Sequence, residues 1–471
     1  MEKEKRISPV YLILCAAAAG LFALLAAFGG VHADEAYALA LVRRSFADIW
    51  RISAAGETPP LYYYAAKLFS MPFGYGEYAV RLFSGVCCLL ITAIGGWEIT
   101  RFWGRKMGLT FMVLFPLYPF AMDHAAQPGV YALAALLVFL SALFAYRVWK
   151  SNMAGDWIGL GLAGICAAYC HNFALVSVVA VYALLFLCAL VCRRKLLKGW
   201  LIAAAASAAA YIPWMKHFIR QMSASAGSDI TARAAVDGAV TLLHAAGNVT
   251  FPLFFGAVLL LILLGVILRR QAVPLLAVGV CALTAGAGIA VSVLIKPVFR
   301  VEYLAPCAPL VAFLLAWGVC AIRREAVFGG VMGFLLVGFA GNLVYGFLPV
   351  STAENQFDQA VAAEHGEAQA YVVLSDNGVH IQQILAYCCP ELPIYAQETL
   401  GDANPYDNIH PMEEFDGQDL DTILAVSDAG SRPISGFPRG FQADLIGTYQ
   451  AEGDSFDLWL LQKQEAEEKA E

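Results

Sequence analysis

The sequence predicts a polytopic α-helical membrane protein, with about eleven transmembrane helices and a small C-terminal extracytoplasmic α/β domain. The 471 residues are 60% hydrophobic and 14% charged, whereas a typical soluble domain is about 25% charged. Residues 1–348 carry 26 Lys and Arg against 14 Asp and Glu, and residues 349–471 carry 4 against 23. A basic membrane domain (1–348) is therefore followed by an acidic domain (349–471), whose charge argues against a nucleic-acid partner.

Eleven apolar runs in the first domain predict the transmembrane helices. They are residues 9–28, 79–100, 107–122, 128–146, 156–171, 173–192, 199–217, 251–268, 273–295, 304–322 and 326–348. Each even-numbered run is followed by Lys or Arg, from Arg101 after the second run to Arg323 after the tenth. Basic loops mark the cytoplasmic side of a plasma membrane. The N-terminus is thus expected inside the cell, and the C-terminal domain outside.

The first apolar run has two interpretations. Val31-His32-Ala33 has the form of a signal-peptidase site, but the many later runs favour an uncleaved membrane anchor. Either way, the outer loop 29–78 lies on the extracytoplasmic side. Within this loop, Leu39, Val42, Phe46, Ile49 and Trp50 recur at helical spacing and predict an amphipathic helix on the membrane surface. A second short amphipathic helix is expected at 61–70, started by Pro59-Pro60.

In the acidic domain, the long apolar runs give way to short hydrophobic segments that are typical of strands. Strands are expected at 371–374, 393–395, 422–426 and 457–461, with a helix at 379–387. Asp376-Asn377-Gly378 follows the first strand, where it is either a ligand-binding loop or a plain turn. The sequence has no P-loop, no Gly-x-Gly-x-x-Gly after a strand and no metal-ligand spacing of Cys and His.

Two adjacent carboxylates, Asp34 and Glu35, stand at the mouth of the first apolar run. Acidic groups close to lipid are costly and usually mark function. Asp34 is therefore the candidate catalytic carboxylate. The structural alternative is that Asp34 caps a helix beginning at Glu35, a common role for Asp that is compatible with catalysis.

The order of motifs resembles the GT-C superfamily of polyprenyl-phosphate-sugar-dependent glycosyltransferases. The resemblance is strongest to the branch of protein O-mannosyltransferases, aminoarabinose transferases and their many bacterial relatives. The segments that carry it are Asp34-Glu35-Ala36-Tyr37, Pro59-Pro60-Leu61-Tyr62-Tyr63, Phe73 to Leu82, Gln127 with Tyr131-Ala132-Leu133, Tyr169 to Ala174 and Ile212-Pro213-Trp214. Each segment alone is weak, but together and in this order they are fairly specific for the superfamily.

The resemblance implies an inverting transfer of sugar from a polyprenyl-phosphate donor to a glycan, lipid or protein acceptor at the outer face of the bilayer. Asp34 would be the base for the acceptor hydroxyl. Glu35 would assist it, position the acceptor or hold a divalent metal such as Mg or Mn, whose need the sequence does not establish.

Cations and polar side chains on the outer side complete the expected site. A departing phosphate needs Arg or Lys, and Lys67, Arg81 and Arg300 are the candidates, with lipid-headgroup contact or snorkelling as the alternative role. Further candidates for the substrate site are Tyr62, Asp123, His124, Tyr131 and His171. His171 is equally consistent with a structural role in a turn.

Two departures from the family pattern keep other functions open. Relatives often have an acid and an arginine between the Gln and the Tyr at the entry of the fourth helix, but here the chain reads Gln127-Pro128-Gly129-Val130-Tyr131. Thr58 stands where relatives often have His. A flippase or transporter and an inactive cell-envelope scaffold are the alternatives. The chain has no internal repeat and its carboxylates gather at one face, which favours the enzyme over a transporter.

Overall fold

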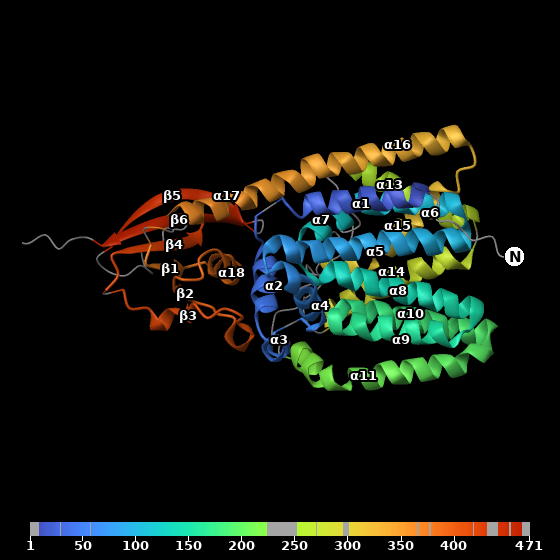
Figure 1. The fold of residues 1–471 in the computed structure, drawn as a ribbon, viewed down its shortest axis with the longest axis horizontal. Coiled ribbons are helices and arrows are strands. Elements are labelled where there is room, and N and C mark those ends of the chain that lie inside the picture. The colour runs from blue at the N-terminus through green and yellow to red at the C-terminus, as the bar shows by residue number, and fades with distance from the viewer. Residues whose placement is uncertain are drawn as a thin grey trace, which may run out of the picture. The chain divides into compact units, whose positions relative to one another are not determined.

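The computed structural model describes residues 9–28, 30–56, 58–223, 252–269, 271–294, 301–364, 366, 368–375, 378–417, 419–430, 441–451 and 454–463. The chain divides into two compact units (Figure 1). The membrane unit comprises Met1–Ala27 and Gly56–Phe347, and the α/β unit comprises Phe28–Ala55 and Leu348–Glu471. Residues 28–55, which follow the first helix, are therefore grouped with the C-terminal residues by their contacts. The division into domains 1–348 and 349–471 that the sequence predicts stays a prediction.

The membrane unit is a bundle of apolar helices, and each of the eleven expected runs overlaps helical residues in the part of the chain that the structure describes. The helices are α1 (Pro9–Leu25), α4 (Leu61–Ser70), α5 (Glu77–Trp103), α6 (Arg105–Leu117), α7 (Pro119–Ala126), α8 (Val130–Ser151), α9 (Ala154–Cys170), α10 (Asn172–Cys192), α11 (Leu197–Ser223), α13 (Pro252–Arg269), α14 (Ala272–Leu294), α15 (Ala308–Val319) and α16 (Glu325–Asn342). Among the described residues, six helices are long and apolar enough to cross a membrane, and four shorter apolar helices accompany them. The count of eleven spans stays a prediction.

One expected span, at 107–122, is interrupted. Helix α6 ends at Leu117, and α7 begins at Pro119 after Tyr118, which has an extended backbone (φ −67°, ψ 132°). A residue before proline is pushed away from the helical region. The break gives α7 its own direction, and α7 carries Asp123 and His124.

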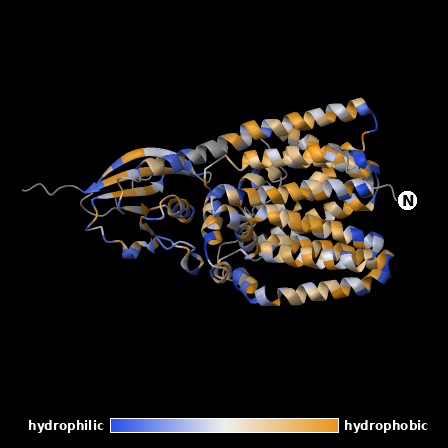
Figure 2. Ribbon diagram, viewed as in Figure 1, coloured by the Kyte–Doolittle hydropathy of each residue, from blue (hydrophilic) through white to orange (hydrophobic). Residues whose placement is uncertain are grey.

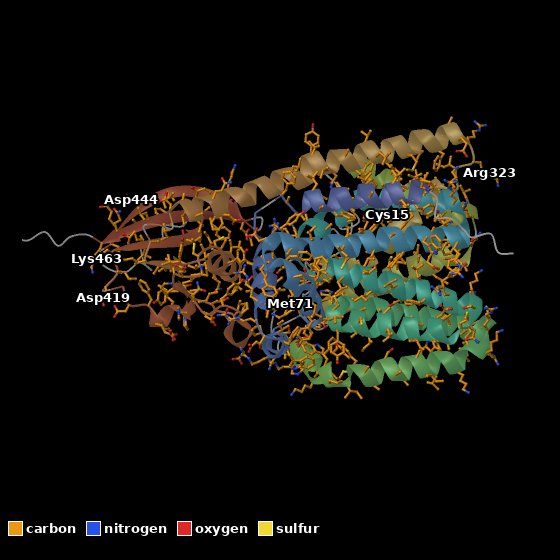
Figure 3. The ribbon with its side chains drawn as sticks, in the orientation of Figure 1. Cys15, Met71, Arg323, Asp419, Asp444 and Lys463 are labelled. Atoms are coloured by element: carbon orange, nitrogen blue, oxygen red, sulfur yellow. The ribbon has the colours of Figure 1, made fainter. Side chains whose placement is uncertain are left out.

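Figure 2 shows that hydrophobic residues dominate the bundle helices and that hydrophilic residues collect at their ends. Met71 and Arg323 lie at opposite ends of the bundle in Figure 3. At the end marked by Arg323, Lys106 pairs with Glu325 at 2.9 Å. At the C-terminal end of α8, Arg147 joins Asp156 at 2.8 Å and Glu98 at 3.6 Å. Basic residues near the helix ends thus pair with neighbouring helices where the sequence predicts the cytoplasmic side.

The α/β unit contains a six-stranded sheet in the order β3-β2-β1-β4-β6-β5. Its strands are β1 (Ala370–Val373), β2 (Ile394–Ala396), β3 (Ile409–Pro411), β4 (Thr422–Asp428), β5 (Phe441–Ala451) and β6 (Asp454–Lys463). Strands β1 to β4 pair in parallel, and β5 and β6 form an antiparallel ribbon beside β4. The four expected strands and the helix at 379–387, which is α18 (Gly378–Cys388), are confirmed. Strands β3 and β5 and helix α17 (Leu348–Glu364) were not expected from the sequence.

Alternate residues of the central strands fill two cores on opposite faces of the sheet. Tyr371 and Val373 of β1 join a core that includes Phe357 of α17 and Ile384 of α18. Val372, between the first two, faces a smaller core on the other side. This alternation is the period of two expected for a strand covered on both faces.

Two short helices, α2 (Ala33–Arg43) and α3 (Phe46–Ala55), replace the single amphipathic helix expected in the outer loop. The chain is extended at Arg44, and Ser45 starts α3 by accepting a hydrogen bond from the backbone N–H of Asp48 at 3.1 Å. Ala33 of α2 belongs to the core of the α/β unit. The expected helix at 61–70 is confirmed as α4. Placement of α2 and α3 on a membrane surface stays a prediction.

Candidate active site

Asp34 and Glu35 occupy the first turn of α2. Carboxylates are stabilised there because the helix dipole and unpaired N–H groups favour negative charge. The helix begins at Ala33, with His32 as its N-cap residue, so the expected capping role of Asp34 at a helix beginning at Glu35 is wrong. The Asp34 side chain is exposed, whereas Glu35 is only 1% exposed. Of the two carboxylates, Asp34 is the one that a substrate can reach.

Polar contacts within the α/β unit hold α2 in place. The hydroxyl of Tyr37 donates to the carbonyl of Ala403 at 3.3 Å. Arg44, at the end of the helix, donates from Nε to the carbonyl of Pro405 at 2.8 Å and pairs with Asp407 at 2.9 Å. Burial, and then the nearby Asp34 carboxylate, raise the pKa of Tyr37, so its phenol keeps its proton. Asp34 is thus carried on a helix whose position is fixed along its length.

In the membrane unit, helices α4 and α5 bring Tyr62, Lys67 and Arg81 into the packed interior. Tyr62 lies 5.7 Å from Phe83 between ring centroids, and its hydroxyl is 3.3 Å from Ser84 Oγ. Lys67 is 9% exposed and Arg81 is 4% exposed. Lys and Arg are almost never this buried without a partner or a function. Both cations are thus held inside the membrane unit, and their role in binding phosphate stays a prediction.

Three of the expected substrate-site residues form one aromatic row. The Tyr131 ring lies 4.9 Å from His124 and 5.4 Å from His171. Tyr303, which the sequence analysis did not single out, extends the row at 5.6 Å from His171. Asp123 stands beside His124 in α7 and is partly buried. Tyr303 is 132 positions from His171, so sequence proximity gave no signal for it.

The two histidines in this row differ in their roles. His171 is the N-cap of α10, and its Nδ1 accepts the backbone N–H of Phe173 at 3.3 Å. The expected structural role of His171 is therefore present in the fold, and its neutral ring carries the proton on Nε2. His124, on the short helix α7, has its pKa lowered to about 4 by burial. It is neutral at physiological pH.

The need for a divalent metal stays an open prediction. Among the residues that the structure describes, no three His, Cys, Asp or Glu side chains gather to hold a metal ion. Arg300, Asp376 and Asn377 lie outside the described residues.

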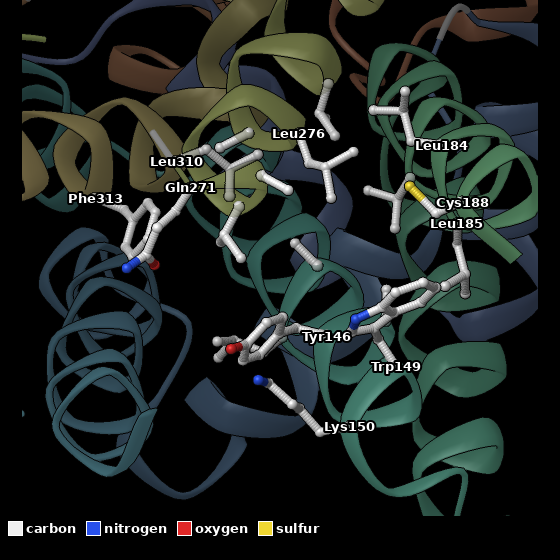
Figure 4. A pocket seen from close by; sticks show the side chains of 18 of the residues that line it. Tyr146, Trp149, Lys150, Leu184, Leu185, Cys188, Gln271, Leu276, Leu310 and Phe313 are labelled. Atoms are coloured by element: carbon white, nitrogen blue, oxygen red, sulfur yellow. The ribbon is translucent and has the colours of Figure 1, made fainter. Parts of the chain in front are cut away.

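The membrane unit also contains an apolar cleft of about 470 Å³ between α5, α8, α10, α14 and α15 (Figure 4). Leu184, Leu185, Leu276 and Leu310 form part of its wall, and Tyr146, Trp149 and Lys150 lie together on one side of it (Figure 4). Apolar walls with one cation at the edge suit a hydrocarbon chain better than a sugar. This cleft is separate from the aromatic row of Tyr131.

Comparison with known proteins identifies the fold. Residues 57–217 match the sequence model of the family described as dolichyl-phosphate-mannose-protein mannosyltransferase. Apo ArnT from Cupriavidus metallidurans aligns with a TM-score of 0.62 at 12% identity, covering 95% of this chain and 97% of that chain. The chain has the GT-C fold. The same ArnT bound to undecaprenyl phosphate aligns with a TM-score of 0.55 at 14% identity, covering 95% and 97%. No curated protein sequence matches.

The GT-C fold confirms the expected fold class, a multi-pass helical membrane protein with a small C-terminal sheet domain. It also confirms the resemblance drawn from the motifs, since the matched family segment begins just before Pro59-Pro60 and ends after Ile212-Pro213-Trp214. The GT-C fold does not itself identify a donor, an acceptor or the orientation of the termini.

Proposed function

We propose that this GT-C protein is an inverting glycosyltransferase that moves a sugar from a polyprenyl-phosphate carrier to an acceptor hydroxyl at the outer face of the plasma membrane. The observation that carries the proposal is the exposed carboxylate of Asp34 on a firmly held helix. The mannosyltransferase family match over 57–217 supports the same class. The undecaprenyl phosphate bound by the ArnT neighbour supports a lipid carrier.

In the proposed reaction, the Asp34 carboxylate accepts the proton of the acceptor hydroxyl as its oxygen attacks the anomeric carbon. The bond from that carbon to the carrier phosphate breaks, and the phosphate leaves with the bonding electron pair. Attack from the face opposite the phosphate inverts the configuration. A general base of this kind contributes about 10²- to 10⁴-fold to the rate.

The departing phosphate gains a full negative charge, which buried cations stabilise more strongly than exposed ones. Lys67 and Arg81 are proposed for this role because both are buried. The amino group of Lys67 lies 4.7 Å above the Tyr75 ring, which restricts where its charge can point. Glu35, buried beside Asp34, is proposed to position α2 and not to touch the acceptor.

The aromatic row around Tyr131 is proposed to bind substrate. A neutral His124 and the Nε2–H of His171 are polar groups set among aromatic faces, a lining typical of small-molecule sites. The missing acid and arginine between Gln127 and Tyr131 are expected to alter which sugar or acceptor is accepted. They do not affect Asp34.

The apolar cleft is proposed to hold part of the carrier's hydrocarbon chain. Most of the residues that line it are apolar, and Lys150 and Gln271 are among its polar residues. A chain that enters the cleft from the bilayer gains from close van der Waals packing, since it is already out of water. A long chain would therefore add affinity that a short analogue lacks.

The assignment as a glycosyltransferase is tested by measuring sugar transfer in membranes that contain the wild type, Asp34→Asn or Asp419→Asn. The membranes are given a panel of labelled polyprenyl-phosphate sugars together with native lipid and glycan extract. Transfer by the wild type and by Asp419→Asn, but not by Asp34→Asn, is expected. Asp419 is also exposed in the α/β unit and is the matched control. Folded protein that transfers nothing from any donor would favour the flippase or scaffold alternative.

A further inference from the structure

An apolar groove of about 530 Å³ lies in the membrane unit between α9 and α11, which pack side by side (Figure 1). Its lining runs from Ala154 to Ile165 on α9 and from Gly199 to Ala210 on α11. None of these residues lines the cleft of Figure 4, and none was assigned to the candidate active site. The proposed sugar transfer therefore gives this groove no role.

The groove opens to the outside of the helix bundle. Ile158, Leu162 and Ile202 line it and are 60 or 61% exposed. Most of the apolar stretch of α11 is likewise not buried by the rest of the unit that the structure describes. In a bilayer the groove therefore faces hydrocarbon, and lipid chains are the molecules that reach it.

The length of the groove matches one leaflet of a bilayer. Ala154 and Ile165 are 11 positions apart, as are Gly199 and Ala210, which corresponds to about 16 Å along each helix. The hydrocarbon core of a bilayer is about 30 Å thick. The groove thus extends from one end of the helices to about the middle of the membrane, which is the depth that one acyl chain of a phospholipid occupies.

One end of the groove is positively charged. Lys198 lies one helical turn before Ile202 on the same face of α11, and Lys195 is three positions earlier. Both lysines are exposed, and neither pairs with an acidic residue in the part of the chain that the structure describes. Asp156, in the first turn of α9, already pairs with Arg147 at 2.8 Å. The two lysine charges are therefore not neutralised by the protein.

The neighbouring arginines are engaged in structure. The guanidinium carbon of Arg193 lies 5.3 Å from the centre of the Trp149 ring, and Arg193 also donates to the carbonyl of Trp149. Arg194 donates from Nε to the carbonyl of Leu190 at 3.3 Å. Lys195 and Lys198 are thus the cations that a ligand at this end of the groove can use.

A tryptophan marks the same end. Trp157 lines the groove three residues after Ala154, and its Nε1–H donates to Oδ1 of Asn152 at 2.9 Å. A Cβ atom at Gly199 would lie 2.5 Å from the Trp157 ring, so the glycine lets the ring stand against α11. Tryptophan rings gather where membrane hydrocarbon meets the lipid headgroups. The apolar part of the groove therefore begins at headgroup level, next to the two lysines.

The groove and the lysines together define a class of ligand. An apolar groove as deep as one leaflet suits a single acyl chain, and lysines at its headgroup end attract phosphate as point charges. Basic sites between helix ends on the cytoplasmic side are typical binding sites for anionic phospholipids. Such a lipid carries its phosphate at the level where its chains begin, as this arrangement requires.

We propose that the groove binds an anionic phospholipid of the leaflet on the Lys198 side, which the sequence predicts to be cytoplasmic. One acyl chain lies between α9 and α11, and the lipid phosphate lies against Lys195 and Lys198. The bound lipid stabilises the position of α11 against α9. This binding does not depend on the proposed sugar transfer.

Cross-linking locates the lipid. The full chain is placed in phosphatidylcholine nanodiscs that contain phosphatidylglycerol with a photoactivatable group on one acyl chain. Cross-links to α9 and α11 should exceed those to α16, another helix with an exposed apolar surface, at least fivefold. Unlabelled phosphatidylglycerol should compete for them. Uniform labelling of the exposed helices would overturn the proposal, and so would competition by a polyprenyl phosphate but not by phosphatidylglycerol.

The role of the two lysines is tested by native mass spectrometry with added phosphatidylglycerol or phosphatidylcholine. Each cation near an anionic lipid contributes about fivefold in affinity. Lys195→Gln/Lys198→Gln should therefore bind phosphatidylglycerol at least about tenfold more weakly than the wild type. Arg323→Gln/Arg324→Gln is the matched control, because it removes two exposed cations at the same end of the bundle but outside the groove (Figure 3). Equal affinity of the wild type for the two lipids would contradict the proposal.

A larger side chain tests the groove itself. Ala206 and Ala208 are both exposed on α11, but only Ala206 lines the groove. Ala206→Trp should lower cross-linking to α9 and α11 at least fivefold, while Ala208→Trp should not. Phosphatidylglycerol should raise the Tm of the wild type and of Ala208→Trp but not of Ala206→Trp. Equal cross-linking in the two variants, or a lipid-free dimer in which a second copy covers the groove, would overturn the proposal.

Discussion

At the scale of single residues, the account depends on which charged groups are buried and which are exposed. Asp34 is exposed while its neighbour Glu35 is buried. The family resemblance gave the two carboxylates different roles, but it did not predict this difference in exposure. The sequence could identify the pair because acidic residues beside an apolar run are rare. It could not assign the accessible one, since that depends on how α2 is turned against α18.

Lys67→Gln tests the proposed phosphate contact. Loss of a charge-assisted hydrogen bond costs about 1.5–3 kcal/mol, so we expect the donor KM to rise about 10- to 100-fold. Lys67→Arg should retain most of the affinity because it keeps the charge. The measurement is initial transfer rate against donor concentration, and an unchanged KM in Lys67→Gln would remove Lys67 from the donor site.

His124 makes the stability of the protein depend on pH. Its pKa is lowered from 6.5 to about 4 by burial, so the unfolded chain binds more protons between these values. The free energy of unfolding must therefore fall as the pH falls from 6.5 towards 4. In His124→Asn this fall should be shallower. Tm values of both proteins across that pH range check the effect, and parallel curves would contradict it.

At the scale of elements, the sequence predicted the helices and strands whose hydrophobic pattern can be recognised within their own residues. Apolar runs and the buried strands β1 and β4 carry their own signal. Strand β3 has only three residues, and β5 mixes polar and apolar residues because it lies at the sheet edge. The break between α2 and α3 arises because Ser45 caps a new helix. The sequence did not predict this break, since the apolar residues from Leu39 to Trp50 keep helical spacing across it.

The hydrogen bond from Arg44 to the Pro405 carbonyl should stabilise the position of helix α2 more than the ion pair between Arg44 and Asp407 does. Asp407 is 87% exposed, and exposed ion pairs contribute about 0–1 kcal/mol. Arg44→Ala also loses the bond to the Pro405 carbonyl, so we expect about 1–3 kcal/mol of local destabilisation. Asp407→Asn should cost less than about 1 kcal/mol. Hydrogen exchange of α2 amides measures both, and equal effects would contradict this division.

The proposed role of the apolar cleft predicts that a larger side chain on α14 will weaken binding of the carrier. Leu276 projects into the cleft (Figure 4), so Leu276→Trp should fill part of it. We expect weaker binding of long-chain carriers, with a Kd about tenfold higher, and little change for short-chain analogues. Leu275→Trp is the control, because Leu275 is 56% exposed and does not line the cleft. Equal effects of both variants would argue against the cleft as a chain-binding site.

At the scale of the whole molecule, the GT-C fold was predictable because apolar runs, basic loops and ordered motifs extend over most of the chain. The grouping of residues 28–55 with 348–471 was not predictable. It depends on packing between segments about 350 positions apart, such as Tyr37 with Ala403.

The central claim is that Asp34 is the base of a sugar transfer. Its most direct test is the single-turnover rate with purified protein in vesicles, for the wild type and Asp34→Asn with saturating donor and acceptor. The account predicts a rate at least about 100-fold lower in the variant, with donor affinity unchanged. Equal rates in the two proteins would contradict it.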